Sequence, residues 1–110
     1  MAIVDVLLRN AYEDTQLLLK NDSLGDQLHV PRDVDFLLRA SNVEKANLVC
    51  SFINDNQYGF AKVQDTDVLV VIHTPIQQNI ICSISGLMAC ISEIFGLDYD
   101  GWGSELRKAT

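Results

Sequence analysis

The chain has 110 residues, 48% of them hydrophobic, and a formal net charge of -7. This length and apolar content predict one folded domain with a hydrophobic core and exclude a disordered chain. The negative charge argues against general nucleic-acid binding and against an anionic membrane surface, because both depend on Lys and Arg contacts with phosphate groups. The three cysteines, Cys50, Cys82 and Cys90, are widely spaced, which predicts free thiols in the reducing cytoplasm.

Residues 2–20 form the first predicted element, an amphipathic helix that ends near residue 21. Apolar side chains recur at helical spacing, and charged side chains lie opposite them. Asp5 and Arg9 interrupt the apolar run, so it predicts neither a signal peptide nor a membrane-spanning helix. The expected apolar stripe consists of Ile3, Val4, Leu7, Leu8, Ala11, Thr15, Leu18 and Leu19.

A strand and a second helix are predicted next. Residues 32–39 alternate between apolar and polar side chains, as a half-buried strand does. Ser41, followed three residues later by Glu44, is a capping-box pattern that predicts a helix start, and this helix would end near residues 54–56. The inward side chains of the strand would be Val34, Phe36 and Leu38.

Residues 58–64 and 67–74 predict a hairpin of two strands. The second is almost wholly apolar, which favours a position in the middle of a sheet. The longest helix is predicted at 76–96, with Gly96 at its end because glycine adopts the left-handed cap conformation, and a short strand at 97–100 follows. The core stripe of this helix would be Ile76, Ile80, Ile84, Leu87, Ile91 and Ile94.

The order of the elements predicts an α+β protein, a ferredoxin-like β-α-β-β-α-β sandwich with an added N-terminal helix. The first and third strands are central in that fold, which agrees with the apolar run at 67–74. A single domain would span 1–110, with residues 1–21 as the N-terminal helix and 26–106 as the ferredoxin-like core.

The sequence contains no pattern that predicts catalysis, a cofactor or a metal site. His29 and His73 are its only histidines, and neither has a partner at metal-ligand spacing. Asp65 and Asp67 flank a predicted turn, where solvated carboxylates are expected. Phosphate-loop, nucleophile-elbow and zinc-protease motifs do not occur. The expectation is a protein that is not an enzyme and binds no cofactor.

Small side chains follow one side of the last predicted helix at spacings of three and four residues. Such a face lets another helix approach closely. Its occupant could be the N-terminal helix of the same chain or a second subunit in a homodimer, and the sequence leaves both open. The face consists of Cys82, Ser85, Gly86, Ala89 and Glu93.

The segment after that helix holds the only tryptophan, Trp102, between two glycines. Tryptophan and tyrosine are common interface anchors, so the indole would either close the core or contact a partner. Between Lys62 and Arg107 there is no Lys or Arg, and this acidic interval would either attract a basic partner or keep the protein soluble. The segment reads Asp98, Tyr99, Asp100, Gly101, Trp102 and Gly103.

The stretch EIFGLDYDGWGSEL, residues 93–106, resembles the C-terminal end of the RraB family, regulators that inhibit the endoribonuclease RNase E. Members of that family carry an acidic residue followed by Tyr-Asp-Gly-Trp-Gly directly after their last helix, and residues 98–103 match this motif. A weaker similarity at 41–44 and 57–60 extends the resemblance over about residues 30–106.

The resemblance implies a ferredoxin-like fold, no catalytic activity, and inhibition of an RNase E-type endoribonuclease by docking on it away from its catalytic centre. Residues 98–103 are the candidate partner-binding residues. The negative charge separately predicts no direct contact with nucleic acid or a membrane. The best-known members continue into a long acidic tail, whereas this chain ends in the short, partly basic residues 104–110, which puts inhibition in question if that tail contributes to binding. A small-ligand regulatory module and a general interaction scaffold are the alternatives.

Overall fold

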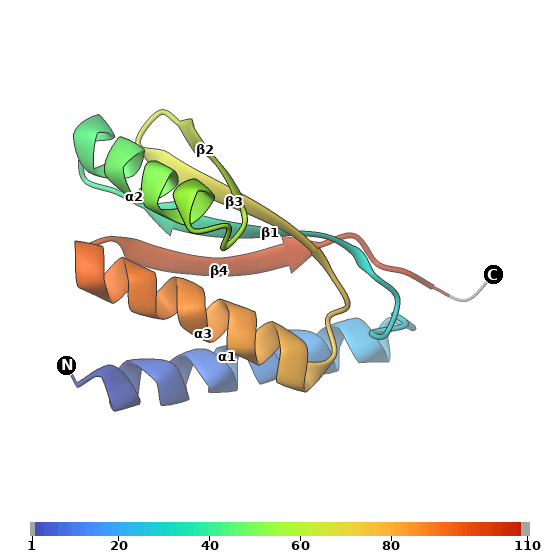
Figure 1. The fold of residues 1–110 in the computed structure, drawn as a ribbon. Coiled ribbons are helices and arrows are strands. Elements are labelled where there is room, and N and C mark those ends of the chain that lie inside the picture. The colour runs from blue at the N-terminus through green and yellow to red at the C-terminus, as the bar shows by residue number, and fades with distance from the viewer. Residues whose placement is uncertain (1, 109–110) are drawn as a thin grey trace.

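The computed structural model describes residues 2–108 and contains three helices and a four-stranded sheet (Figure 1). The sheet order is β2-β3-β1-β4, and every neighbouring pair is antiparallel. This is the ferredoxin-like α+β arrangement with an N-terminal helix, as the sequence predicts. In chain order, the elements are α1 (Ile3–Ser23), β1 (Arg32–Arg39), α2 (Val43–Asp55), β2 (Phe60–Gln64), β3 (Asp67–Thr74), α3 (Gln78–Phe95) and β4 (Asp98–Ser104).

Helices α2 and α3 cover one face of the sheet, and α1 runs alongside α3 in the opposite direction (Figure 1). Strand β1 alternates as predicted, because its even-numbered apolar side chains are buried under the helices while Asp33 and Asp35 are exposed on the other face. The centre of the core is fully buried and comes from the two central strands: Val34, Phe36, Leu38, Val68 and Val70.

Helix α3 is rotated relative to the apolar stripe that the sequence predicts. Ile91 is buried as expected, but Leu87 is 39% exposed and Ile94 76% exposed, so the prediction is wrong at these two positions. The reason is that α3 contacts both the sheet and α1 and therefore buries two sides, one of them lined by small and polar residues. Its buried residues are Ile81, Ser85, Met88, Ala89, Ile91 and Ser92.

By length and composition alone, α3 could cross a membrane. Core helices of globular domains meet the same criteria, and here the helix packs against the sheet and against α1 (Figure 1). Its end is the predicted one, since Gly96 adopts the left-handed conformation with φ of 74°.

The start of α2 and the extent of β4 differ from prediction. Asn42, and not Ser41, caps α2, because its side-chain oxygen accepts a hydrogen bond from the Lys45 backbone N–H at 2.8 Å. Strand β4 continues to Ser104, well beyond the predicted 97–100. A shift in register opposite β1, with Gly101 at φ of 85°, keeps the strand paired so that Trp102 lies opposite Phe36.

The connection from α1 to β1 is held by a buried ion pair that the sequence did not reveal. Arg32 is 1% exposed, and its Nη1 donates to both carboxylate oxygens of Asp26 at 2.7 and 2.8 Å. The same guanidinium also donates to the carbonyl oxygens of Gln27 at 2.7 Å and Glu105 at 3.1 Å. These contacts tie the connection to the segment that follows β4.

Candidate functional site

A buried hydrogen-bond network joins α1, α3 and β4. The Asp14 carboxylate, in a residue only 4% exposed, accepts hydrogen bonds from Ser85 Oγ at 3.1 Å and from Trp102 Nε1 at 3.0 Å. Ser85 Oγ also lies 2.7 Å from the Tyr99 hydroxyl. Asn10 Nδ2 donates to Asp14 at 3.3 Å and to Ser85 Oγ at 3.1 Å. The network thus connects the small-residue face of α3 with the motif in β4.

Burial determines the electrostatics of this network. Desolvation raises the pKa of Asp14 above its ordinary value, although the hydrogen bonds from Ser85 and Trp102 act in the opposite direction and stabilise the carboxylate. The nearby charge of Glu13 adds to the increase. Desolvation also raises the pKa of the Tyr99 hydroxyl, so this group stays protonated and available as a hydrogen-bond donor.

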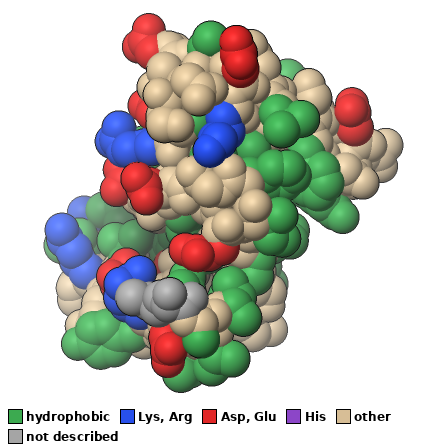
Figure 2. All heavy atoms as spheres, turned by 90° about the vertical axis from the view of Figure 1, so that its left-hand side faces the viewer, with side chains coloured by type: hydrophobic (Ala, Val, Ile, Leu, Met, Phe, Trp, Pro, Cys, Tyr) green, Lys and Arg blue, Asp and Glu red, His purple; other side chains and the backbone are tan. Residues whose placement is uncertain are grey.

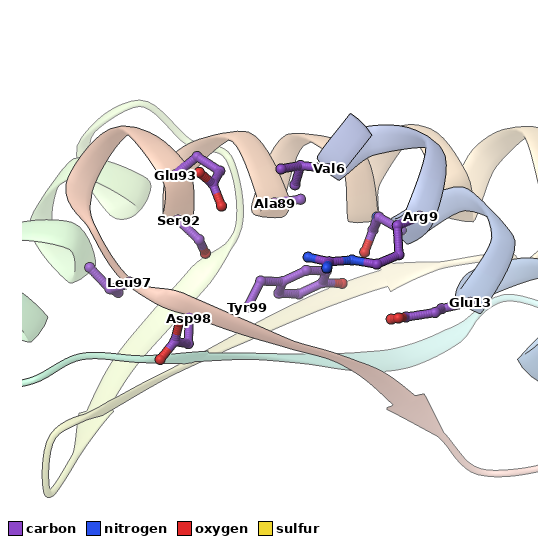
Figure 3. Close-up of a pocket in the computed structure, with 10 residues that line it drawn as sticks. Val6, Arg9, Glu13, Ala89, Ser92, Glu93, Leu97, Asp98 and Tyr99 are labelled. Carbon is purple, nitrogen blue, oxygen red and sulfur yellow. The ribbon is translucent and has the colours of Figure 1, made fainter. Parts of the chain in front are cut away.

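Beside the network lies a cavity of about 260 Å³, which we call the α1–α3–β4 cavity (Figure 3). It is bounded by the N-terminal half of α1, the C-terminal end of α3 and the start of β4. Asn10 and Tyr99 belong to both the network and the cavity wall. The apolar part of the wall consists of Val6, Ala89 and Leu97.

The charged groups of the cavity are three carboxylates and one guanidinium, which gives a formal net charge of -2. Glu93 and Asp98 lie at one end, with Arg9 and Glu13 toward the other (Figure 3). The Arg9 side chain extends into the space beside the Tyr99 ring (Figure 3). Within residues 2–108, Arg9 forms no ion pair.

Ser92 provides the one buried hydroxyl of the cavity wall that lacks a partner. The residue is 1% exposed, and its Oγ forms no hydrogen bond with any described part of the chain. The hydroxyl points from α3 into the cavity, toward the start of β4 (Figure 3). Buried polar groups are normally paired, so this oxygen marks a position where a ligand group could bind.

The motif at 98–103 lies in β4, an edge strand, and its members have different surroundings. Trp102 is only 8% exposed and belongs to the core. Of the two alternatives that the sequence leaves open for the indole, it therefore closes the core. Asp98 is exposed and lines the cavity. Asp100 is also exposed, but its carboxylate is paired with Arg39 at 3.0 Å. Of the two acidic residues, Asp98 is therefore the one available to a partner.

The small-residue face of α3 meets α1 of the same chain over part of its length. Ser85 bonds to Asp14, and a Cβ placed on Gly86 would lie 3.8 Å from Leu7 Cδ2. Ala89 and Glu93 line the cavity instead. A homodimer through the remaining part of this face stays a prediction.

An apolar stretch lies next to the charged side chains on the end of the molecule where α1 begins and α3 ends (Figure 2). Exposed hydrophobic residues on the two sheet-covering helices include Leu48 at 58% and Ile94 at 76%. The half-buried Phe52 and Phe95 rings of the same two helices pack with centroids 5.1 Å apart. This end of the molecule therefore combines acidic, basic and apolar surface.

Sequence reasoning missed the roles of Arg9, Asn10 and Asp14; it placed Arg9 on the polar side of the first helix and assigned the other two to neither side. A signal for Asp14 was present, because the residue lies three positions after Ala11 and four before Leu18, both on the predicted apolar stripe. An acidic residue at such a position must be paired when it is buried.

The described residues contain no group of three or more His, Cys, Asp or Glu side chains that could hold a metal ion. The three cysteines are free thiols. Fold and site together define a ferredoxin-like α+β protein with an acidic cavity where its N-terminal helix meets the last helix and strand. No family model matches the sequence, and no curated protein matches it.

Proposed function

We propose that this chain is a non-catalytic cytoplasmic regulator that binds another protein, an RNase E-type endoribonuclease, and reduces its cleavage of RNA. The observation that carries the proposal is the arrangement of the Asp-Tyr-Asp-Gly-Trp-Gly motif in β4. Tyr99 and Trp102 fasten this edge strand to the core through the buried network, while Asp98 faces the cavity and solvent. The motif thus presents a charged group on a rigid support, as a binding site for a protein requires.

The chemistry of the network favours a structural role over catalysis. Ser85 and Asp14 resemble a nucleophile beside a base, but both are buried and neither lines the α1–α3–β4 cavity, so a substrate in the cavity does not reach them. Neither histidine joins this network. His73 lies on β3, where its Nδ1 is 2.9 Å from Asp33.

Charge supports a basic partner. The chain carries a formal net charge of -7, and the cavity concentrates carboxylates where α3 ends and β4 begins. Complementary charge mainly increases the rate of encounter and fixes orientation. The apolar stretch beside the cavity would supply the buried contacts on which affinity depends.

The direct test measures binding and cleavage with a purified RNase E-type endoribonuclease and a labelled RNA substrate. The wild-type protein should bind the enzyme and slow cleavage, while the protein alone should leave RNA intact. Asp98→Asn should weaken binding, and Asp65→Asn, which removes one charge at the opposite edge of the sheet, should not. Full-rate cleavage at a large molar excess of this protein over the enzyme, together with no detectable complex, would overturn the proposal.

A small-ligand regulatory module is the second candidate, and the cavity is the observation that favours it. Arg9 near one end and the Glu93 and Asp98 carboxylates at the other suit the two charges of a free amino acid. A ligand that binds only the native state raises its stability, so a thermal-shift screen with amino acids and nucleotides tests this function.

A further inference from the structure

We propose that the α1–α3–β4 cavity binds the guanidinium group of one arginine side chain on the protein partner. The inference rests on the proposed protein-binding function and specifies which group of the partner enters the site. It draws on four observations: the charge of the cavity, the unpaired Ser92 hydroxyl, the apolar wall and the position of Arg9.

The charge of the cavity favours a cation. Glu13, Glu93 and Asp98 outweigh the single positive charge of Arg9. The last turn of α3 carries no basic residue of its own, and the C-terminal end of a helix attracts positive charge. One cation from another element is near this end: Lys45 Nζ lies 3.2 Å from where a Cβ on Gly96 would be.

Ser92 and the apolar wall indicate that the cation is a guanidinium group at the end of an aliphatic side chain. The buried Ser92 Oγ needs a hydrogen-bond donor, and a guanidinium has five N–H donors in a planar fork that can serve this hydroxyl and a carboxylate together. Val6, Ala89 and Leu97 form apolar wall against which the methylene groups of such a side chain can pack. A volume of about 260 Å³ suits one side chain.

Arg9 shows that a guanidinium fits this space. Its side chain extends into the cavity beside the Tyr99 ring and has no ion pair within the described residues (Figure 3). An incoming arginine would meet repulsion from the positive charge of Arg9. Removing the Arg9 charge should therefore strengthen binding of a cation, whereas it would weaken binding of an anion or a zwitterion.

The test uses N-acetyl-arginine amide, which carries a guanidinium and no carboxylate, and follows the backbone amide signals of Ser92, Leu97 and Tyr99 by NMR. N-acetyl-citrulline amide is the neutral control of nearly the same shape. The arginine probe should bind saturably in about the millimolar range, as expected for one isolated side chain, and the citrulline probe should not bind. Equal binding of both probes, or no shift with either, would overturn the inference.

Variants then assign the binding to the cavity. Glu93→Gln and Asp98→Asn should each weaken the arginine probe by about two- to fivefold, and Arg9→Gln should tighten it by a similar factor. Asp65→Asn is the matched control with the same loss of charge at the far edge of the sheet, and it should leave binding unchanged. Weaker binding by Arg9→Gln would contradict a cation site.

Titration of the same variants against the endoribonuclease separates this inference from the proposed function. If the enzyme binds wild type and Glu93→Gln equally and the arginine probe does not bind, the inference fails while the proposed function stands. If the probe binds as expected and the enzyme does not, the cavity chemistry stands and the proposed function fails. If the endoribonuclease uses this cavity, its binding site should contain an arginine that enters it. When that arginine is changed to lysine or glutamine, Glu93→Gln should no longer weaken binding of the enzyme.

Discussion

Asp14 and Trp102 depend on each other within the core. The indole is 8% exposed, and its Nε1 is one of the neutral donors that compensate for the buried carboxylate. The residue that looks most like an interface anchor in the sequence thus has a structural role. The neighbouring Asp98, which lines the cavity, carries the proposed binding function.

Substitution of Trp102 measures this structural role. Trp102→Ala should lower the free energy of unfolding by about 3–5 kcal/mol, because it removes a large buried side chain. Trp102→Phe keeps an aromatic ring but removes the Nε1 donor to Asp14, and it should cost about 1.5–3 kcal/mol because one hydrogen bond to a charged group is lost. Urea unfolding monitored by circular dichroism gives both values. Unchanged unfolding of Trp102→Ala would show that the indole contributes nothing to the core.

Ionisation of Asp14 should make stability depend on pH. Because its pKa in the folded state is raised above 3.8, the native state binds more protons than the unfolded state between the two values. Stability is therefore lost as pH rises through this window, and the loss is complete above the folded-state pKa. The side chain in Asp14→Asn cannot ionise, so this variant does not lose stability through the window. The free energy of unfolding of Asp14→Asn minus that of wild type should therefore increase with pH over the window and then level off.

Urea unfolding at a series of pH values from 3.5 upward tests the dependence on Asp14, starting just below the ordinary pKa of 3.8. Asp22→Asn, an exposed position on the same helix, controls for the loss of one charge. A difference between wild type and Asp14→Asn that stays constant with pH would contradict the raised pKa.

At the scale of the elements, two contacts attach the ends of the chain to the sheet. Helix α1 is fastened to α3 and β4 through Asp14, and the connection after α1 is fastened through Asp26 and Arg32. The second contact also holds the segment after β4, because the Arg107 backbone N–H donates to Asp26 at 3.1 Å. The first contact joins the three elements that bound the cavity, α1, α3 and β4.

Loss of the buried ion pair should be strongly destabilising. Arg32→Ala leaves the Asp26 carboxylate buried without its cation, which should cost about 3–5 kcal/mol. The double variant Arg32→Ala with Asp26→Ala removes both charges and should lose less than the sum of the two single substitutions. A double-mutant cycle measured by chemical unfolding gives the coupling, and strictly additive losses would argue against this pairing.

The contact between α1 and α3 predicts the outcome of enlarging Gly86. A leucine at this position would press on Leu7 and should lower stability by about 1–3 kcal/mol through overpacking, without changing the molecular mass in solution. Sedimentation and thermal unfolding measure the two quantities. Ser83→Leu, an exposed position on α3, is the control. A dimeric wild type that dissociates in Gly86→Leu would instead place a second subunit on this face.

At the scale of the whole molecule, the net charge of -7 should govern how fast a basic partner associates. At physiological ionic strength, screening limits the reach of surface charge to about 8 Å, so added salt should slow the association rate much more than it changes dissociation. Stopped-flow or surface-plasmon measurements with the endoribonuclease across a salt series test this. A flat association rate would mean that the charge serves solubility alone.

The periodicity of the sequence was sufficient to predict the order of helices and strands and the ferredoxin-like fold. Alternation at 32–39 and the apolar run at 67–74 are local patterns that report directly which side chains meet the core and which strand is central. Gly96 also predicted the end of α3, because the left-handed cap is a property of a single residue. Such features depend on neighbours within a few positions, which the sequence displays.

Only the tertiary structure decided which side of α3 is buried and where the cavity lies. The apolar stripe on α3 was wrong at Leu87 and Ile94 because a helix that contacts both a sheet and a second helix buries polar positions such as Ser85 and Ser92. Arg9 is far in the sequence from Ser92 and Asp98, and the three form one site only because α1 packs antiparallel to α3 beside β4. Long-range packing of this kind leaves no local pattern in the sequence, because the role of each residue depends on neighbours that only the fold brings next to it.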